Sequence, residues 1–200
     1  MYWLFTALLS VFQAEAPLPP AYPRPGTVNL IDNERVLVWD ISWLKQTYPL
    51  HRHPYDLVGV YYTDGDRAIV NTQGNRRPVS TKAWETAFQA RGVTHIEEGA
   101  SEAPLKAVFV EIKADGPGGI AAGASTASLA PSRATQRFDN ERATVWEIVA
   151  PVDDTPHTHA RDVVVASFSG GKASAQYVPG GRSHTDGDRR ADRVYIFELK

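Results

Sequence analysis

The sequence contains no cysteine, which excludes disulfides, thiolate nucleophiles and zinc–thiolate sites. It has no strong charge of either sign, because the formal net charge is −2 at pH 7. Such a chain has no electrostatic reason to bind nucleic acid or an anionic membrane. No apolar run is long enough to span a bilayer. Phosphate-binding loops, dinucleotide fingerprints, G-x-S-x-G elbows and H-E-x-x-H helices are also absent, which excludes several common enzyme classes.

The N-terminal residues 1–16 combine a short apolar run with the small residues of Ala14-Glu15-Ala16, an A-x-A pattern that signal peptidase accepts. This pattern predicts a signal peptide and a secreted or periplasmic protein. A cytoplasmic protein is the alternative, in which these residues pack on the fold or on a partner subunit, because no Lys or Arg precedes the run and Pro17 follows it. Residues 17–27 are rich in proline and predict an extended linker.

The chain repeats itself, and this repeat determines the predicted fold. Residues 32–40, DNERVLVWD, align with residues 139–147, DNERATVWE, at a shift of 107 positions. Residues 107–113 resemble 193–200 in the same order along the chain. Short β-branched and aromatic runs separated by turn residues predict strands in both copies. We therefore expect two all-β units, 28–113 and 135–200, joined by a Gly/Ala/Ser-rich linker at 114–134.

The second copy is shorter than the first. The interval from His53 to His95 is 42 positions and that from His159 to His184 is 25, so 17 positions are missing, which predicts a trimmed hairpin. The arginine of each DNER segment has two interpretations. It could bind a substrate carboxylate, but a salt bridge with a nearby acidic residue is favoured.

All six histidines occupy matching places in the two copies. Residues two apart in a strand point to the same face, so the two histidines of each H-x-H pair converge. A third histidine, preceded three residues earlier by glycine, would complete each set and leave open positions on a divalent metal ion. The alternative is strand histidines that only satisfy hydrogen bonds. The two predicted ligand sets are His51, His53 and His95, and His157, His159 and His184.

These motifs resemble those of the cupin superfamily. Asn33-Glu34-Arg35-Val36 followed by residues 49–56, PLHRHPYD, is similar to the first cupin motif, and residues 179–184, PGGRSH, to the second. The likeness covers about residues 28–113 and 135–200 and is greatest to uncharacterised cupin-domain proteins. It implies an all-β fold, a double-stranded β-helix or jelly-roll barrel of cupin type, duplicated in one chain as a bicupin with metal held inside.

The likeness departs from the family pattern at the acidic ligand. Aspartates, Asp56 and Asp162, replace the usual glutamate and stand one residue closer to the histidines. We expect each to be a fourth ligand or an acceptor that orients an imidazole, with Asp56 the candidate catalytic residue. The resemblance implies a divalent ion (Fe, Mn, Ni or Zn), a small-molecule substrate and dioxygenase-like or isomerase-like chemistry. The alternative is a non-catalytic binding or structural protein with a degenerate site. A homodimer is also compatible with the sequence.

Overall fold

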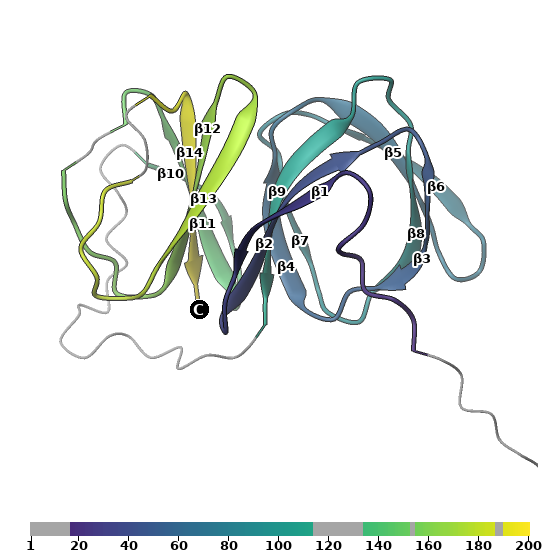
Figure 1. Ribbon diagram of the computed structural model, residues 1–200, viewed down its shortest axis with the longest axis horizontal. Coiled ribbons are helices and arrows are strands. Elements are labelled where there is room, and N and C mark those ends of the chain that lie inside the picture. Colours follow the sequence, from purple (N-terminus) through teal and green to yellow (C-terminus); the bar gives the residue numbers. More distant parts are fainter. Residues whose placement is uncertain (1–16, 114–133, 153–154, 187–189) are drawn as a thin grey trace, which may run out of the picture.

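The computed structural model describes residues 17–113, 134–152, 155–186 and 190–200, all of them in strands, turns and loops (Figure 1). The expected signal peptide and residues 114–133 of the expected linker lie outside these ranges. Among the described residues there is no helix that is long and apolar enough to cross a membrane. The strands are β1 (Thr27–Asp32), β2 (Val36–Trp43), β3 (Thr47–Arg52), β4 (Asp56–Tyr61), β5 (Gly65–Val70), β6 (Arg76–Thr81), β7 (Thr86–Gln89), β8 (Thr94–Gly99), β9 (Leu105–Ile112), β10 (Thr135–Asp139), β11 (Ala143–Val149), β12 (Val163–Ser169), β13 (Lys172–Val178) and β14 (Arg193–Leu199).

Two five-stranded sheets have the same strand order. The first half contains β1-β2-β9-β4-β7 and the second half contains β10-β11-β14-β12-β13, in which each strand takes the place of its counterpart from the repeat. Even an irregularity is repeated, because the register shifts between Asn29 and Ile31 in β1 and between Gln136 and Phe138 in β10. The predicted all-β fold, a duplicated jelly roll, is confirmed.

The two halves differ in their second sheet. In the first half β3-β8-β5-β6 faces the five-stranded sheet and closes the barrel, as Figure 1 shows on the right. In the second half β12 turns directly into β13 through Gly170 and Gly171, both with positive φ, where the first half inserts the β5–β6 hairpin. The counterpart of the β3–β8 pairing is a single bridge between His157 and His184. The 17 positions missing from the second copy therefore correspond to this hairpin, which spans Gly65–Thr81.

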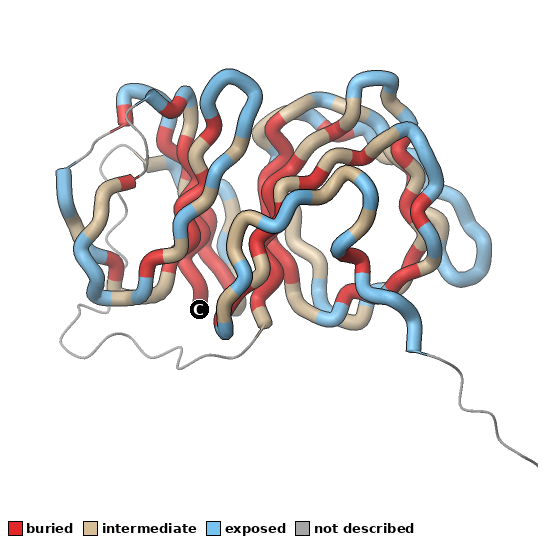
Figure 2. Tube along the Cα trace, viewed as in Figure 1, coloured by how far each residue is buried: buried red, intermediate tan, exposed pale blue. Residues whose placement is uncertain are grey.

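The two five-stranded sheets pack face to face, and their central strands β9 and β14 are buried on both faces. In β9, Val108 and Val110 belong to the cluster between the halves, whereas Ala107 and Phe109 belong to the cluster inside the first barrel. This division follows from the alternation of side chains along a strand. Figure 2 shows the buried residues concentrated along these central strands. The sheet interface thus joins the two halves into one body.

The N-terminal segment 17–27 is not the free linker that its prolines predict. Pro20 forms a bridge with Arg52, and Ala21 and Tyr22 are buried among the aromatic residues inside the first barrel. The guanidinium of Arg24 lies 3.9 Å from the ring centroid of Tyr48. Burial of Tyr22 and stacking of Arg24 on Tyr48 hold this proline-rich segment in place. Amino-acid composition alone does not reveal these contacts.

A turn separates β6 from β7. Residues 80–81 end β6 and residues 86–89 form β7, with a turn between them in which Trp84 has a φ of +72°. The Trp84 ring stacks on Tyr195 of the second half, with centroids 6.1 Å apart. The turn therefore directs a large aromatic side chain into the interface between the halves.

Candidate metal sites

Three histidines converge inside the first barrel. His51 is the penultimate residue of β3 and lies directly opposite His95 in β8, and His53 follows immediately after β3. Their ring centroids lie 4.8–5.2 Å apart, and the side chains are almost fully buried. The Nδ1–H of His51 donates to the carbonyl oxygen of Pro49 at 2.8 Å, which fixes the tautomer and leaves the Nε2 lone pair facing the cluster.

The environment of this cluster suits a cation. Burial lowers the pKa of His51, lowers that of His53 to about 3 with help from the neighbouring His95, and lowers that of His95 to about 4. All three imidazoles are therefore neutral near pH 7, the form that binds metals. His51 Nε2 and His53 Nδ1 are buried without a hydrogen-bond partner. The Nε2 atoms of His53 and His95 lie 3.4 Å apart, close to the ~3.3 Å that separates two nitrogens on one tetrahedral zinc ion.

A carboxylate that the sequence analysis missed lies beside this cluster. Glu97 is two residues after His95 on the same face of β8, and its Oε1 is 3.9 Å from His95 Nε2. Arg24 and Arg67 bind it at 2.6 and 2.9 Å. Burial alone would raise the pKa of Glu97, but these two guanidinium groups hold it at about 2. Glu97 is thus a fixed anion engaged by arginines.

The second half gathers four donors. The Nε2 atoms of His157 and His159 lie 3.2 Å apart, and the rings of His157 and His184 have centroids 4.7 Å apart. Asp186, which the sequence analysis also missed, points its Oδ1 into the group. This oxygen lies 2.9, 3.8 and 3.7 Å from Nε2 of His157, His159 and His184, respectively.

Orphaned atoms mark this second cluster as well. Asp186 Oδ1 and His184 Nε2 are buried without a hydrogen-bond partner. Nδ1 of His157 lies 3.0 Å from the carbonyl oxygen of Thr155, so this nitrogen carries the proton and Nε2 faces the aspartate. All four donor atoms lie within 4.8 Å of one another. A cation at their centre would satisfy every one of them.

Asp56 and Asp162, expected as ligands, lie outside both clusters. Asp56 opens β4 in the five-stranded sheet, whereas the histidines of that half come from the β3–β8 side. Its carboxylate lies 3.0 Å from Arg142 Nε and accepts a hydrogen bond from the Arg91 amide. Asp162 accepts hydrogen bonds from the Tyr177 hydroxyl and the Gly180 amide. Both carboxylates are engaged elsewhere, and neither belongs to a group of donors that could hold a metal, while the catalytic role expected of Asp56 stays a prediction.

The arginines of the repeated DNER segments form salt bridges, as predicted, and the pairs cross between the halves. Arg142 of the second half binds Asp56 of the first, and Arg35 of the first half lies 3.6 Å from Asp162 of the second. The position that resembles a cupin ligand therefore serves here in a reciprocal contact between the halves.

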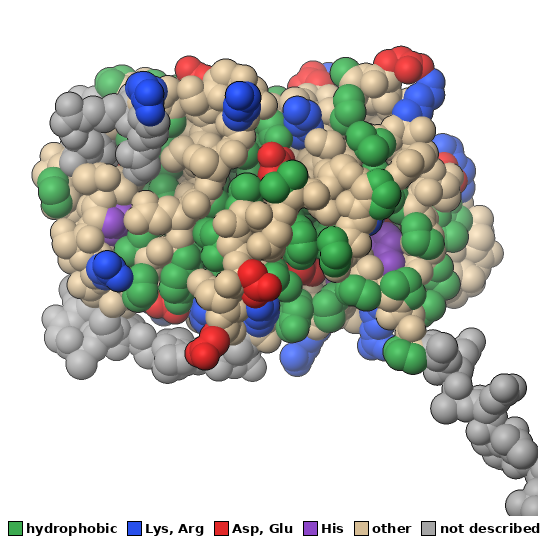
Figure 3. Space-filling model, viewed as in Figure 1, with side chains coloured by type: hydrophobic (Ala, Val, Ile, Leu, Met, Phe, Trp, Pro, Cys, Tyr) green, Lys and Arg blue, Asp and Glu red, His purple; other side chains and the backbone are tan. Residues whose placement is uncertain are grey.

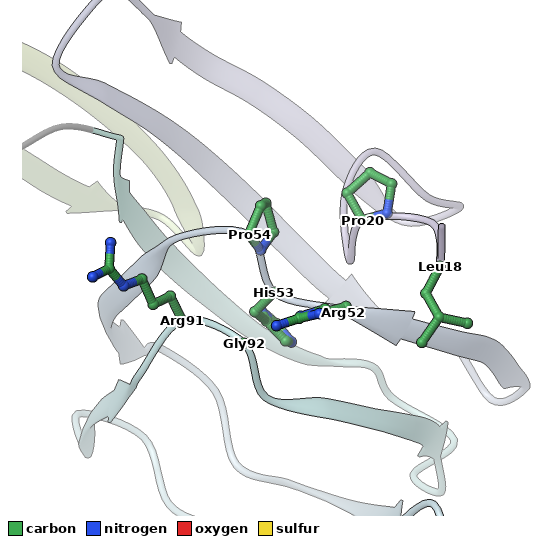
Figure 4. A pocket seen from close by; sticks show the side chains of 7 residues that line it. All are labelled: Leu18, Pro20, Arg52, His53, Pro54, Arg91 and Gly92. Carbon is green, nitrogen blue, oxygen red and sulfur yellow. The ribbon is translucent and has the colours of Figure 1, made fainter. Parts of the chain in front are cut away.

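Pockets reach both clusters. One of about 600 Å³ opens beside His53, and Figure 4 shows Arg52 and His53 at its centre, between the segment carrying Leu18 and Pro20 and the loop with Arg91. A second, of about 450 Å³, includes His95. A third, of about 490 Å³, includes His184 in the second half. In Figure 3, histidine side chains are visible at the surface of both halves.

Comparison with known proteins identifies the fold. The sequence matches no protein-family model, and no curated protein matches it. A cupin domain from Bordetella pertussis Tohama I is 29% identical over 47% of this chain and 100% of its own, with a TM-score of 0.41. AerE from Microcystis aeruginosa is 10% identical over 88% of this chain and 98% of its own (TM-score 0.55), and an oxalate decarboxylase variant from Bacillus subtilis is 10% identical over 87% and 72% (TM-score 0.50). The chain has the cupin fold.

Within this cupin fold the two clusters offer different chemistry. Three neutral imidazoles in the first barrel form a set that leaves coordination positions for water or a small molecule, as catalytic metal sites do. Three imidazoles and a carboxylate in the second half form a four-donor set, as structural metal sites do. Imidazole accepts Fe, Mn, Ni and Zn alike, so the donors could hold a divalent ion but do not select which one.

Proposed function

We propose that this cupin binds a divalent metal ion through His51, His53 and His95 and acts on a small organic molecule there. The observation that carries the proposal is the convergence of three buried, neutral imidazoles next to pockets that open to solvent, with the Nε2 of His51 buried and without a hydrogen-bond partner. A buried polar atom without a partner is costly, and a bound cation removes that cost.

The residues of the barrel have separate tasks in this proposal. The Pro49 carbonyl holds the ring of His51 with Nε2 facing inward, and the ring of Tyr22 packs edge-on against His53 and beside Trp39. Glu97 contributes a fixed negative charge on one side, since Arg24 and Arg67 keep it ionised. A bound metal would supply Lewis-acid polarisation or, if redox-active, dioxygen activation, which corresponds to isomerase-like or dioxygenase-like chemistry.

A second candidate function, metal-dependent stability without turnover, is favoured by Asp186. With this carboxylate the second cluster has four donors, the number typical of structural zinc sites. We propose that the second cluster holds a structural ion which compensates for the absent hairpin. A binding or structural role for the whole chain would follow if the first cluster proved to have no turnover.

The test is a metal inventory of three proteins purified without chelators: wild type, His53→Ala and His159→Ala. We expect two metal equivalents in wild type and the loss of one, from different sites, in each variant. An oxygen-electrode and product screen with keto-acid, phenolic and sugar substrates should show activity that His53→Ala removes and His159→Ala retains. The absence of stoichiometric metal in wild type, even after reconstitution with Fe, Mn, Ni or Zn, would contradict the proposal.

A further inference from the structure

The pocket of about 450 Å³ beside His95 lies where three strand ends meet. Its wall combines apolar and polar side chains from the ends of β5, β6 and β7 and the start of β8. Two of its polar residues, Arg77 and Gln89, have no role in the metal clusters or in the contact between the halves. These two side chains indicate which class of molecule the pocket could bind.

Arg77 lies on the inner face of the four-stranded sheet, at its rim. Arg77 in β6 lies directly opposite Ile69 in β5, and Ile69 lies directly opposite Glu97 in β8. Residues directly opposite one another in an antiparallel sheet have their side chains on the same face, so all three share one face. Glu97 and His95 lie on the barrel side of β8, so Arg77 faces that side too. Arg77 forms no salt bridge or side-chain hydrogen bond with any residue that the structure describes. Its neighbour Arg76 faces outward and binds Glu98 at 2.7 Å.

Gln89 approaches the same pocket from the opposite sheet. Its register partner is Leu57, which belongs to the cluster inside the first barrel, so Gln89 also faces inward. Its Nε2 is buried and has no hydrogen-bond partner. An amide donor in this state is unfavourable unless a ligand accepts its hydrogen bond.

We propose that this pocket binds a small carboxylic acid, with the carboxylate on Arg77 and Gln89. The guanidinium matches a carboxylate with two parallel N–H donors, and the Gln89 amide adds a third. Ile69 and Val93, which also line the pocket, contact the apolar body of the acid, and His95 lies along the same wall. The choice of substrate class rests on the proposed function, but recognition of the carboxylate does not require the metal.

The test is calorimetric titration with benzoate and with its neutral counterpart benzamide, on protein whose metal content is measured in the same samples. Wild type should bind benzoate more tightly than benzamide. Arg77→Gln should weaken benzoate binding about 5- to 10-fold, because a charge-assisted pair at a solvated rim is lost, and should leave benzamide unchanged. Gln89→Leu should weaken benzoate binding by a smaller factor.

Lys82→Gln is the control, since it removes one exposed positive charge from the same half at a residue that does not line the pocket. It should leave benzoate affinity within about twofold of wild type, because a screened outer charge contributes little. Equal binding of benzoate and benzamide, or loss of benzoate binding in Arg52→Gln instead of Arg77→Gln, would overturn the proposal. If benzoate binding depends on Arg77 in protein that takes up no metal, the carboxylate site stands and the proposed metal function fails.

Discussion

The two histidine clusters differ most in the contacts of one carboxylate, which occupies the same position in each copy of the repeat. Glu97 and Asp186 each stand two residues after the third histidine of their copy. Glu97 is bound by two arginines and keeps 3.9 Å from the nearest histidine nitrogen. Asp186 comes within 2.9 Å of His157 and lies among three imidazoles. One ancestral pattern has thus produced a three-donor site and a four-donor site.

The missing hairpin accounts for part of this difference. Arg67, which binds Glu97, lies on β5, and β5 has no counterpart among the described strands of the second half. Without that arginine a carboxylate at this position finds its nearest cationic or polar partners among the histidines. Loss of one hairpin therefore removes a barrel wall and also frees a fourth donor.

The largest expected effect is on stability. Glu97→Gln leaves the two guanidinium groups of Arg24 and Arg67, only 6% and 13% exposed, without a counter-charge. Breaking a buried ion pair in this way costs about 3–5 kcal/mol of unfolding free energy. Asp186→Asn, the matched change in the second half, should cost metal-free protein much less, which urea unfolding of both variants would measure. Equal destabilisation would remove the distinction between the two carboxylates.

The stability that Glu97 contributes should also depend on pH. The pKa of Glu97 is lowered from 4.5 to about 2, so its contribution to stability is complete above pH 4.5 and is lost as the pH falls toward 2. The difference in unfolding free energy between wild type and Glu97→Gln should therefore be greatest at neutral pH and shrink steadily below pH 4.5. A difference that does not change with pH would show that the arginines do not stabilise the ionised form of Glu97.

The next expected effect is a loss of metal affinity at one cluster and not at the other. His53→Ala and His159→Ala should each weaken binding at the altered site by more than about 100-fold, since changes to groups that only orient ligands cost about 10- to 100-fold. Each variant should leave the other site within about twofold of wild type, because distant sites behave independently. Competition titration with a chromogenic chelator measures both affinities. Parallel losses at both sites in one variant would mean that the halves are coupled.

Asp186→Asn should give an intermediate effect confined to the second cluster. An amide oxygen can still approach the ion but carries no charge, so we expect a loss of about 10- to 100-fold in affinity there. Glu97→Gln is the comparison: it removes a charge that two arginines already neutralise, so the first cluster should lose less affinity than the second loses in Asp186→Asn. Unchanged affinity in Asp186→Asn would leave the second cluster with three ligands, like the first.

The sequence predicted what depends on periodicity and missed what depends on distant partners. Duplication, strands and the three-histidine sets follow from alternation and repeat spacing, and the structure brings both predicted histidine sets together. Glu97 and Asp186 each stand two residues after a histidine, a spacing that predicts a side chain on the same face of a strand as that histidine. What each carboxylate binds depends on Arg24 and Arg67, which lie far away along the chain. Asp56 and Asp162 lie outside the clusters, and the arginine that pairs with each comes from the other half, which repeat spacing does not reveal.

The smallest expected effect tests that contact between the halves. Asp56→Asn weakens one ion pair of Arg142, where both side chains are less than one-fifth exposed, and should lower the unfolding free energy by about 1–2 kcal/mol. Metal content and any activity should stay unchanged, because Asp56 is not in the first cluster. The double-mutant cycle with Arg142→Gln isolates the pair, and its coupling energy should account for most of the loss. If Asp56→Asn instead removed metal from the first cluster, the carboxylate would act as a ligand, and the site would have four donors like its counterpart.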